Sequence, residues 1–295
     1  MGSVFILKHQ VPYFHRPKSH LMLYTAEQVA QLPEHTFAHL EVDHSDQVLT
    51  LTLNRPEKKN ALNAVLMREL AFALAYAHHT ANVWVVVLKA NGNIFCAGAD
   101  LKQFAGQKGA ETNSTIPEEP SEILMGELFL QVHKPIVAQV HAPLFAGAHL
   151  LVCGCTHVVA AESATFSLPE VKRGLWPMQV MASLAPLMSA RQLLDYCMRA
   201  QSLSAAEAQD LGLATQVAPD DQLEQAVRDL VADILQYSPT AIRLGLKAWD
   251  EMRALHHAQA HAFLKTKLNE MLHTEDAKEG LAAFMEKRAP QWTGN

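Results

Sequence analysis

Three short, predominantly apolar segments constrain the fold of this chain more than any other feature. They are Val83–Leu88, Pro135–Val140 and Val158–Ala161. A run without alternating polar residues is typical of a strand that is covered on both faces, as strands are in parallel sheets. Segments with the helical spacing of apolar residues lie between these runs. The chain therefore predicts an α/β protein in which the strands pair largely in parallel.

A strand pair and a capped helix precede these segments. Residues 39–43 and 49–53 alternate apolar and polar side chains around a short turn, which predicts a hairpin with one buried face. Asn63 then precedes a run with the apolar periodicity of a helix, and asparagine is a favoured N-cap. The pattern of apolar residues in the last part of the chain predicts helices only, over residues 222–236, 239–254, 258–272 and 275–287.

The same patterns divide the chain into three parts. Residues 1–36 contain three prolines and no sustained period, so we interpret them as an N-terminal extension or arm. Strands and helices alternate over residues 37–218, and residues 219–295 form a helical region. Within the middle part, residues 105–121 are rich in Gly, Pro, Ser and Thr, which is typical of a mobile loop.

Composition excludes several classes of protein. Hydrophobic residues make up 49% of the chain, which is enough for a substantial core. The 24 Lys and Arg residues against 30 Asp and Glu give a net charge of −6, so we expect no nucleic-acid partner. We find neither an apolar stretch long enough to cross a membrane nor a secretory signal pattern. The four cysteines lie among small apolar residues without zinc-site spacing, which predicts reduced thiols, a cytoplasmic location and no metal site.

Two turns of small residues and one carboxylate are candidates for chemistry. Ala97–Asp100 follows a predicted strand, and its small residues would let the backbone approach a ligand. Ala146–Ala148 precedes a short apolar helix, whose first N–H groups have no acceptor within the helix. Glu170 stands in apolar company just after the third apolar segment. Turns of small residues also occur where the chain simply packs closely, which is the alternative interpretation of the two turns. The alternative for Glu170 is an ordinary glutamate in a solvated turn.

Five segments in this order resemble the crotonase (enoyl-CoA hydratase/isomerase) superfamily. The matching segments are Asn54–Leu62, Ala97–Lys102, Lys134–Ala138, Pro169–Gly174 and Glu275–Arg288. The resemblance covers the chain from about residue 37 to residue 295. It implies a spiral of ββα units, a C-terminal helical region that forms a homotrimer or hexamer, and an acyl-CoA thioester as substrate. It implies no cofactor, because coenzyme A is part of the substrate.

The resemblance also assigns roles to individual residues. The backbone N–H groups of Ala99 and Gly147 would form an oxyanion hole that polarises the thioester carbonyl and stabilises the enolate. Lys58, Asn60 and Ala61 would border the adenine of coenzyme A. The remaining positions expected near the substrate are Asp100, Leu101, Lys102, Leu150 and Trp176, together with Phe284 and Lys287 from a neighbouring subunit.

One departure from the family pattern decides the expected chemistry. Hydratases of the family carry two glutamates, of which the second corresponds to Glu170 and the first to Leu150. A leucine can neither orient water nor exchange a proton, and loss of a general acid or base commonly lowers a rate by about 10²–10⁴. A single carboxylate can still move a proton from C2 of a 3-enoyl-CoA to C4, and in this respect the site resembles Δ3,Δ2-enoyl-CoA isomerases. Burial beside Leu168 and Trp176 would raise the pKa of that carboxyl.

Two alternatives stay open. His149 stands beside Leu150 and could hold water or act as a base in a hydratase, hydrolase or decarboxylase. The opposing interpretation is that its side chain points away from the site, and the same interpretation applies to His141. The other alternative is a non-catalytic acyl-CoA-binding subunit, which Leu150 favours and which Glu170 and the two oxyanion positions disfavour.

Overall fold

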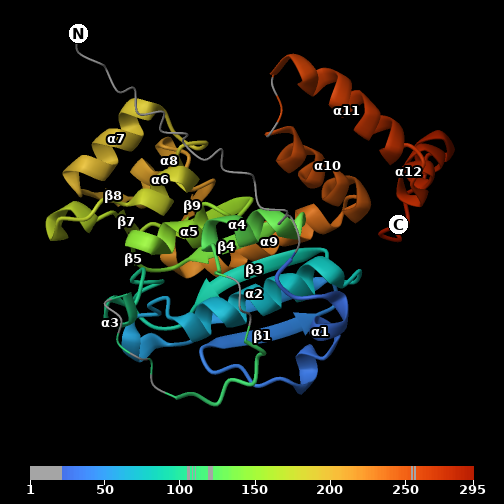
Figure 1. The fold of residues 1–295 in the computed structure, drawn as a ribbon. Helices are drawn as coiled ribbons and strands as arrows, with labels where there is room; N and C mark the ends of the chain where they lie inside the picture. The colour runs from blue at the N-terminus through green and yellow to red at the C-terminus, as the bar shows by residue number, and fades with distance from the viewer. Residues whose placement is uncertain are drawn as a thin grey trace, which may run out of the picture.

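The structure is a computed structural model of the chain in which strands and helices alternate, as the apolar segments predict (Figure 1). It describes residues 22–104, 107, 109, 111–118, 122–253, 255 and 257–295. Most of the expected N-terminal extension (residues 1–21) and several positions of the loop expected at 105–121 lie outside the described residues.

Nine strands and twelve α-helices have the following bounds in the described part of the chain. The strands are β1 (Leu40–Ser45), β2 (Val48–Leu53), β3 (Val85–Ala90), β4 (Ile136–Val140), β5 (Leu144–Phe145), β6 (His157–Ala161), β7 (Thr165–Ser167), β8 (Ser202–Ser204) and β9 (Gln216–Ala218). The helices are α1 (Ala26–Ala30), α2 (Ala64–His79), α3 (Leu101–Phe104), α4 (Met125–Val132), α5 (His149–Val152), α6 (Met178–Leu184), α7 (Ala190–Arg199), α8 (Ala205–Asp210), α9 (Leu223–Leu235), α10 (Pro239–Met252), α11 (His257–Met271) and α12 (Glu275–Glu286).

The main sheet has six strands in the order β1-β2-β3-β4-β6-β9. β1 and β2 form the expected antiparallel hairpin, with Leu40 opposite Leu53. All the other neighbours in this sheet pair in parallel. The three apolar segments of the sequence form β3, β4 and β6, and their side chains are almost entirely buried. The predicted α/β class with largely parallel pairing is therefore confirmed.

A second, three-stranded sheet in the order β5-β7-β8 positions the candidate site. β5 and β7 run in parallel, with Leu144 opposite Phe166. Cys96 also forms a parallel bridge with Leu144, so the three residues make one aligned row across three chain segments. The carboxyl ends of parallel segments meet at one edge, which is where α/β proteins commonly bind ligands.

Helix α2 joins the N-terminal residues to the core. Asn63 caps this helix as predicted, because its side chain accepts a hydrogen bond from the N–H of Leu66. Helix α1 packs against α2, and Tyr24 is fully buried with its ring edge-on to Phe72 at 5.0 Å. The described part of the expected extension, residues 22–36, is therefore packed against the core.

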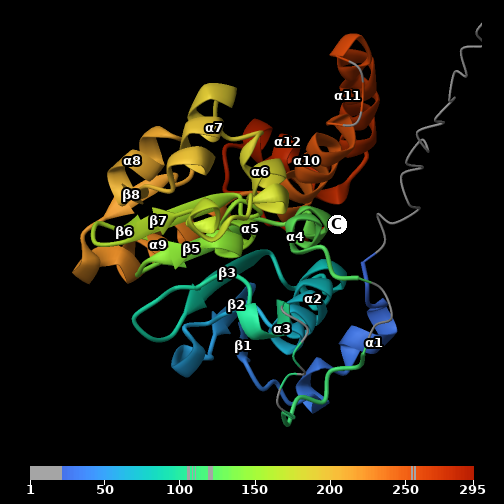
Figure 2. The ribbon, with the colours of Figure 1, turned by 60° about the vertical axis from the view of Figure 1, so that its left-hand side comes forward.

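The C-terminal region is helical, as predicted. Helix α9 packs on β3, β4 and β6, whereas α10–α12 pack mainly on one another and extend away from the main sheet (Figure 2). Buried Asp276 ties this region together, because it accepts hydrogen bonds from the hydroxyl of Ser238 and the N–H of Thr293, each at 2.8 Å. No helix in the described part of the chain is long and apolar enough to cross a membrane.

Replacing Glu69 with glutamine should destabilise this fold. Glu69 is fully buried in α2, and its two carboxylate oxygens accept hydrogen bonds from the N–H groups of Ala38 (2.6 Å) and His39 (2.9 Å). Glutamine turns one acceptor into a donor and leaves a buried N–H without a partner, which costs about 1–3 kcal/mol. Denaturant unfolding measures the change, and exposed Glu224→Gln is the control, expected to stay within about 0.5 kcal/mol. Equal free energies of unfolding for the two variants would contradict the prediction.

Candidate active site

Three groups follow the aligned row of Cys96, Leu144 and Phe166 toward the same edge of the sheet. Ala99 and Gly147 lie three positions beyond their members of the row, and Glu170 lies four positions beyond its own. Because the three segments run in parallel and in register, the fold brings these groups to one edge. The two backbone positions and the carboxylate that the sequence singles out thus belong to one candidate site.

The N–H group of Ala99 faces the loop that carries Gly147. On the other side of this segment, the N–H of Leu62 donates to the carbonyl of Gly98 (2.8 Å), and the N–H of Asp100 donates to the carbonyl of Leu62 (2.9 Å). In a parallel bridge the residue between two such bonds directs its own N–H and carbonyl to the opposite side. A Cβ atom placed on Gly147 would lie 3.5 Å from the Ala99 nitrogen, so the two loops are in direct contact.

The loop after β5 is a short 3-10 helix, Ala146–Ala148, in an unusual backbone conformation. Ala146 has a φ of 52°, in the left-handed region that residues with a Cβ atom rarely adopt. The N–H of Gly147 lies in the first turn, where it has no acceptor within the helix. Ala99 is exposed and Gly147 is half-buried, so both residues border solvent-accessible space. This arrangement fits two donors to one carbonyl oxygen.

Glu170 begins the 3-10 helix Glu170–Arg173, just beyond β7. The residue is half-buried, and its Oε2 atom is buried without a hydrogen-bond partner among the described residues. Desolvation by burial raises the pKa of this carboxyl above its usual value, although the Arg173 guanidinium and the backbone N–H of Glu170 act in the opposite direction. A carboxyl with a raised pKa and a free oxygen is suited to accept and return a proton.

The surroundings expected to shape an acyl pocket are apolar. Leu150 lies on α5 and is 7% exposed, next to the Cα position of Gly126 on α4. Trp176 is half-buried and packs against the core, with its Nε1–H donating to the sulfur of Met181 at 3.4 Å. Leu150 thus offers an aliphatic side chain where the two-glutamate pattern has a carboxylate.

Both histidines considered from the sequence are engaged within the protein. His149 is fully buried, with its Nδ1 at 2.8 Å from the carbonyl oxygen of Ala146 and its Nε2 at 2.9 Å from the hydroxyl of Tyr196. Burial lowers the pKa of His149 to about 4. The Nε2 of His141 lies 2.7 Å from the carbonyl oxygen of Gly92, and His141 precedes β5 instead of following it. These contacts favour the interpretation that both side chains point away from the site.

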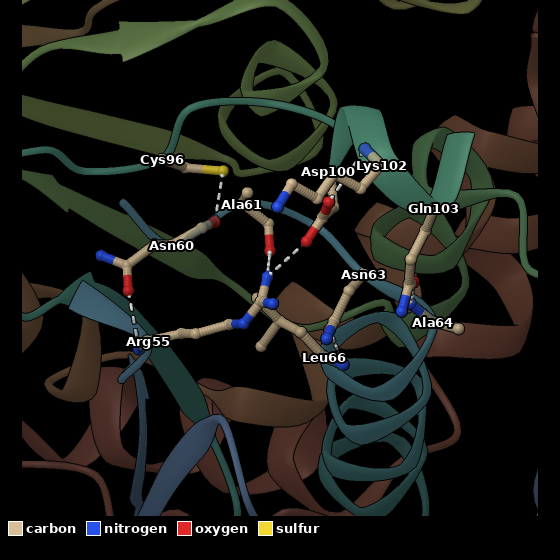
Figure 3. Close-up of polar contacts among 10 residues, drawn as sticks. All are labelled: Arg55, Asn60, Ala61, Asn63, Ala64, Leu66, Cys96, Asp100, Lys102 and Gln103. Carbon is tan, nitrogen blue, oxygen red and sulfur yellow. Dashed lines mark hydrogen bonds and ion pairs between the residues drawn. The ribbon is translucent and has the colours of Figure 1, made fainter. Parts of the chain in front are cut away.

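The loop between β2 and α2 is joined to the Ala99 segment by an ion pair (Figure 3). The Arg55 guanidinium donates to the Asp100 carboxylate at 2.9 Å and to the carbonyl of Ala61 at 3.1 Å. This contact, together with accepted backbone N–H groups, holds the pKa of Asp100 below its usual value despite desolvation. Asp100 and Ala61 therefore lie together, as expected for one rim of the site, and Arg55 links them. Arg55 belongs to the first of the five matching sequence segments, but the sequence alone gives no sign of this contact.

The side chain of Asn60 is fully buried and works inside the protein. Its amide group donates to the carbonyls of Asn91, Ile94 and Phe95. Its oxygen accepts the N–H of Arg55 at 2.8 Å (Figure 3). The side chain fixes the loop, and Asn60 as a whole, backbone included, is buried within this chain.

The remaining residues expected at coenzyme A fall into two groups. Lys58, Leu101 and Lys102 are exposed on the loop and on α3, near Asp100. Phe284 is 83% exposed on α12, and Lys287 follows at the end of the same helix. Helices α3 and α12 lie far apart in Figure 1, so one chain does not bring these two groups together.

A cavity away from the candidate site lies among the helices. It has a volume of about 910 Å³ and lies between α4, α6 and α10, with Leu124, Ser183 and Trp249 in its lining. Its lining, drawn from the described residues, does not include the two oxyanion positions or Glu170. No group of three or more His, Cys, Asp or Glu residues in the described part of the chain is arranged to hold a metal ion.

Comparison with known proteins identifies the class. The enoyl-CoA hydratase/isomerase family matches residues 43–295. The 2,3-dehydroadipyl-CoA hydratase of Escherichia coli (strain K12) is 31% identical over 263 residues, which cover 87% of this chain and 99% of that protein. A probable enoyl-CoA hydratase of Rhizobium meliloti (strain 1021) is 32% identical over 260 residues, covering 87% and 98%. The crystal structure of enoyl-CoA hydratase from Mycobacterium tuberculosis H37Rv matches with a TM-score of 0.77 at 30% identity, covering 88% and 100%.

The fold is thus the α/β fold of crotonase-type proteins, with the C-terminal helices in place. The chain belongs to the enoyl-CoA hydratase/isomerase family and is an acyl-CoA enzyme of that family. The resemblance seen in the five sequence segments is confirmed.

Replacing Gly98 with alanine should disturb the site more than the same change at Gly174. Both glycines have a left-handed φ, 82° and 72°, which costs a residue with a Cβ atom about 1–2 kcal/mol. At Gly98 the new Cβ would also lie 2.8 Å from the Cβ of Ala146 and 2.8 Å from the carbonyl oxygen of Phe145. At Gly174 no atom of the described residues lies within 4 Å of it.

The collision should lower the free energy of unfolding of Gly98→Ala by about 1–3 kcal/mol beyond that of Gly174→Ala. Denaturant unfolding of the two variants, measured side by side, checks the difference. Equal stabilities would show that the two loops are not in close contact.

Proposed function

We propose that this enzyme moves a proton on an enoyl-CoA thioester through Glu170 and so shifts a double bond from C3 to C2. One observation carries the proposal. A single half-buried carboxyl with an unpartnered oxygen lies at the same sheet edge as two available backbone N–H groups, while Leu150 provides no second carboxylate. The site thus contains one proton carrier and one place for an oxyanion.

The proposed reaction has two proton transfers. The N–H groups of Ala99 and Gly147 both donate hydrogen bonds to the thioester oxygen and polarise the carbonyl, which acidifies C2 of a 3-enoyl-CoA. The Glu170 carboxylate removes a proton from C2, and the electrons pass onto the oxygen as an enolate. The same carboxyl then returns the proton to C4, where the electrons of the C3–C4 double bond form the new C–H bond. The enolate electrons form the C2–C3 double bond as the carbonyl is restored. One N–H donor of this kind is worth about 2.7–4 kcal/mol in the transition state.

Hydration is the second candidate, because the relatives named above carry hydratase names. Hydration by two glutamates needs a second group to hold water, and this chain has Leu150 at that position. His149 does not serve as that group in our proposal, because both of its ring nitrogens are within hydrogen-bond distance of protein atoms. A non-catalytic acyl-CoA-binding subunit needs no proton carrier, so the raised pKa and unpartnered oxygen of Glu170 argue against that role.

The exposed apolar surface of the C-terminal helices supports a further part of the proposal, an oligomer. Exposed apolar side chains gather on the C-terminal helices, where Leu268, Leu272 and Leu281 are 48–56% exposed and Phe284 is 83% exposed. Such residues are typical of a protein interface. We propose that α12 of one subunit meets coenzyme A bound to another, with Lys287 near the phosphates. The reaction requires no cofactor beyond the coenzyme A of the substrate.

Glu170→Gln should abolish isomerisation of 3-enoyl-CoA. Glutamine keeps the size of the side chain but cannot exchange a proton, so kcat/KM should fall by about 10²–10⁴. The wild-type kcat/KM should rise with pH as the carboxyl loses its proton, with a midpoint above that of an ordinary glutamate because burial raises the pKa of Glu170. The variant should lack this rise.

Product analysis after incubation with 3-enoyl-CoA and 2-enoyl-CoA of several chain lengths makes the measurement. Exposed Glu162→Gln, at the end of β6, is the matched control and should keep wild-type turnover. Near wild-type isomerisation by Glu170→Gln would rule out the proposed mechanism, and 3-hydroxyacyl-CoA as the main wild-type product would favour hydration.

Leu150→Glu should add hydration to the reactions of this enzyme. The new carboxylate would stand where the two-glutamate pattern places its first acid, so hydration of 2-enoyl-CoA should increase at least about tenfold. Leu150→Gln is the control, since it has a similar size and no proton to exchange. Formation of 3-hydroxyacyl-CoA measures the effect. An equal rate for the two variants would show that position 150 does not contact the reacting carbons.

A further inference from the structure

The donor at Gly147 belongs to a peptide unit whose other end is held inside the protein. The carbonyl of Ala146 and the N–H of Gly147 lie in one planar peptide group and point in opposite directions. When the N–H faces the thioester oxygen, the carbonyl must face the interior. Any group that fixes this carbonyl also fixes the direction of the N–H.

The Ala146 carbonyl is fixed by His149. It accepts a hydrogen bond from the backbone N–H of His149, and the Nδ1 atom of the His149 side chain lies 2.8 Å from the same oxygen. A carbonyl can only accept, so Nδ1 carries the hydrogen. Nε2 must then act as the acceptor for the hydroxyl of Tyr196 at 2.9 Å. The Ala146 carbonyl therefore requires the Nδ1–H tautomer, and the Tyr196 hydroxyl supports this tautomer by donating to Nε2.

The backbone around this contact requires such support. Ala146 adopts a left-handed φ of 52°, which is unfavourable for a residue with a Cβ atom. The loop also leaves almost no space, because a Cβ atom on Gly98 would lie 2.9 Å from the nitrogen of Gly147. A strained conformation of this kind persists only when its surroundings hold it in place.

Helix α7 connects both halves of the site through Tyr196. This side chain is 4% exposed, and burial raises the pKa of its hydroxyl, with Cys153 and Glu170 acting in the same direction. Helix α7 also packs against the 3-10 helix that begins at Glu170. Rings surround the imidazole as well, with Phe166 and Tyr196 edge-on to His149 at 6.4 and 5.8 Å. Burial lowers the pKa of His149 to about 4, so the ring stays neutral near pH 7 and keeps its single Nδ1–H.

We propose that His149, with its Nε2 atom held by the Tyr196 hydroxyl, is a positioning residue that aims the Gly147 N–H at the thioester oxygen. The inference rests on the proposed oxyanion role of Gly147. His149 does not contact the substrate. It acts through the Ala146–Gly147 peptide, and Tyr196 acts through His149.

Two substitutions at His149 separate positioning from packing. His149→Asn keeps an N–H donor the same number of bonds from the backbone as Nδ1, whereas His149→Leu fills the space without a donor. Loss of a whole oxyanion donor lowers kcat by about 10²–10³, so a misdirected donor should lower kcat of the leucine variant by about 10–10²-fold. Its KM should change less than about threefold, and the asparagine variant should stay within about fivefold of wild-type kcat.

The carbonyl stretch of bound butanoyl-CoA, labelled with ¹³C at the thioester carbonyl, gives a readout that needs no turnover. Hydrogen bonds to the oxygen lower this infrared frequency. Wild type and His149→Asn should show the full lowering, and His149→Leu a smaller one. Tyr196→Phe keeps the ring and removes the hydroxyl, so it should reduce both kcat and the frequency shift in the same direction. His141→Asn is the control and should match wild type in both measurements.

Wild-type kcat and carbonyl frequency in His149→Leu would overturn the inference, as would equal impairment of the leucine and asparagine variants. If His149→Leu does not fold, Tyr196→Phe decides, and an unchanged carbonyl frequency in that variant would overturn the inference. Failure of the proposed function gives a different result: wild type would not convert enoyl-CoA, while the frequency of bound butanoyl-CoA would still report whether His149 aims the donor.

Discussion

The candidate site depends on the parallel alignment of three chain segments. Cys96, Leu144 and Phe166 stand in one row through a backbone bridge and the β5–β7 register. Parallel strands place their carboxyl ends at the same edge, so the turns that follow all open toward one point. This is why two backbone N–H groups and one carboxylate, separated by dozens of residues in the sequence, lie at one edge, where we propose that they act on a single thioester group.

Close contacts hold the backbone in place at this edge of the sheet. Gly98 has no room for a Cβ atom beside Ala146, and Ala146 itself keeps a left-handed conformation. Arg55 and the amide of Asn60 hold the neighbouring loop through hydrogen bonds to several carbonyl groups. Donors that are fixed before the substrate arrives need no reorganisation when charge develops on the oxygen, and this is the main source of their effect.

Charge and burial act locally in this protein. The net charge of −6 gives no hint of an anionic ligand, whereas exposed Lys58 and Lys102 lie at the rim near Asp100. At Glu170 burial outweighs the nearby Arg173 guanidinium and raises the carboxyl pKa. At His149 burial is complete and the ring stays neutral. Burial thus raises the pKa of the group that we propose as the proton carrier and keeps neutral the group that we propose as the support of a peptide.

The sequence by itself determined the fold class, the hairpin, the Asn63 cap, the four C-terminal helices and the family, because these depend on local periodicity, capping and short motifs. It also indicated Ala99, Gly147 and Glu170 through their motifs. Only the tertiary structure decided how side chains are used across long sequence separations. The contact between His149 and Tyr196 spans 47 positions, and the buried amide of Asn60 reaches carbonyls more than 30 positions away. No local pattern encodes such contacts, since they arise when separate elements pack and every buried polar group must find a partner.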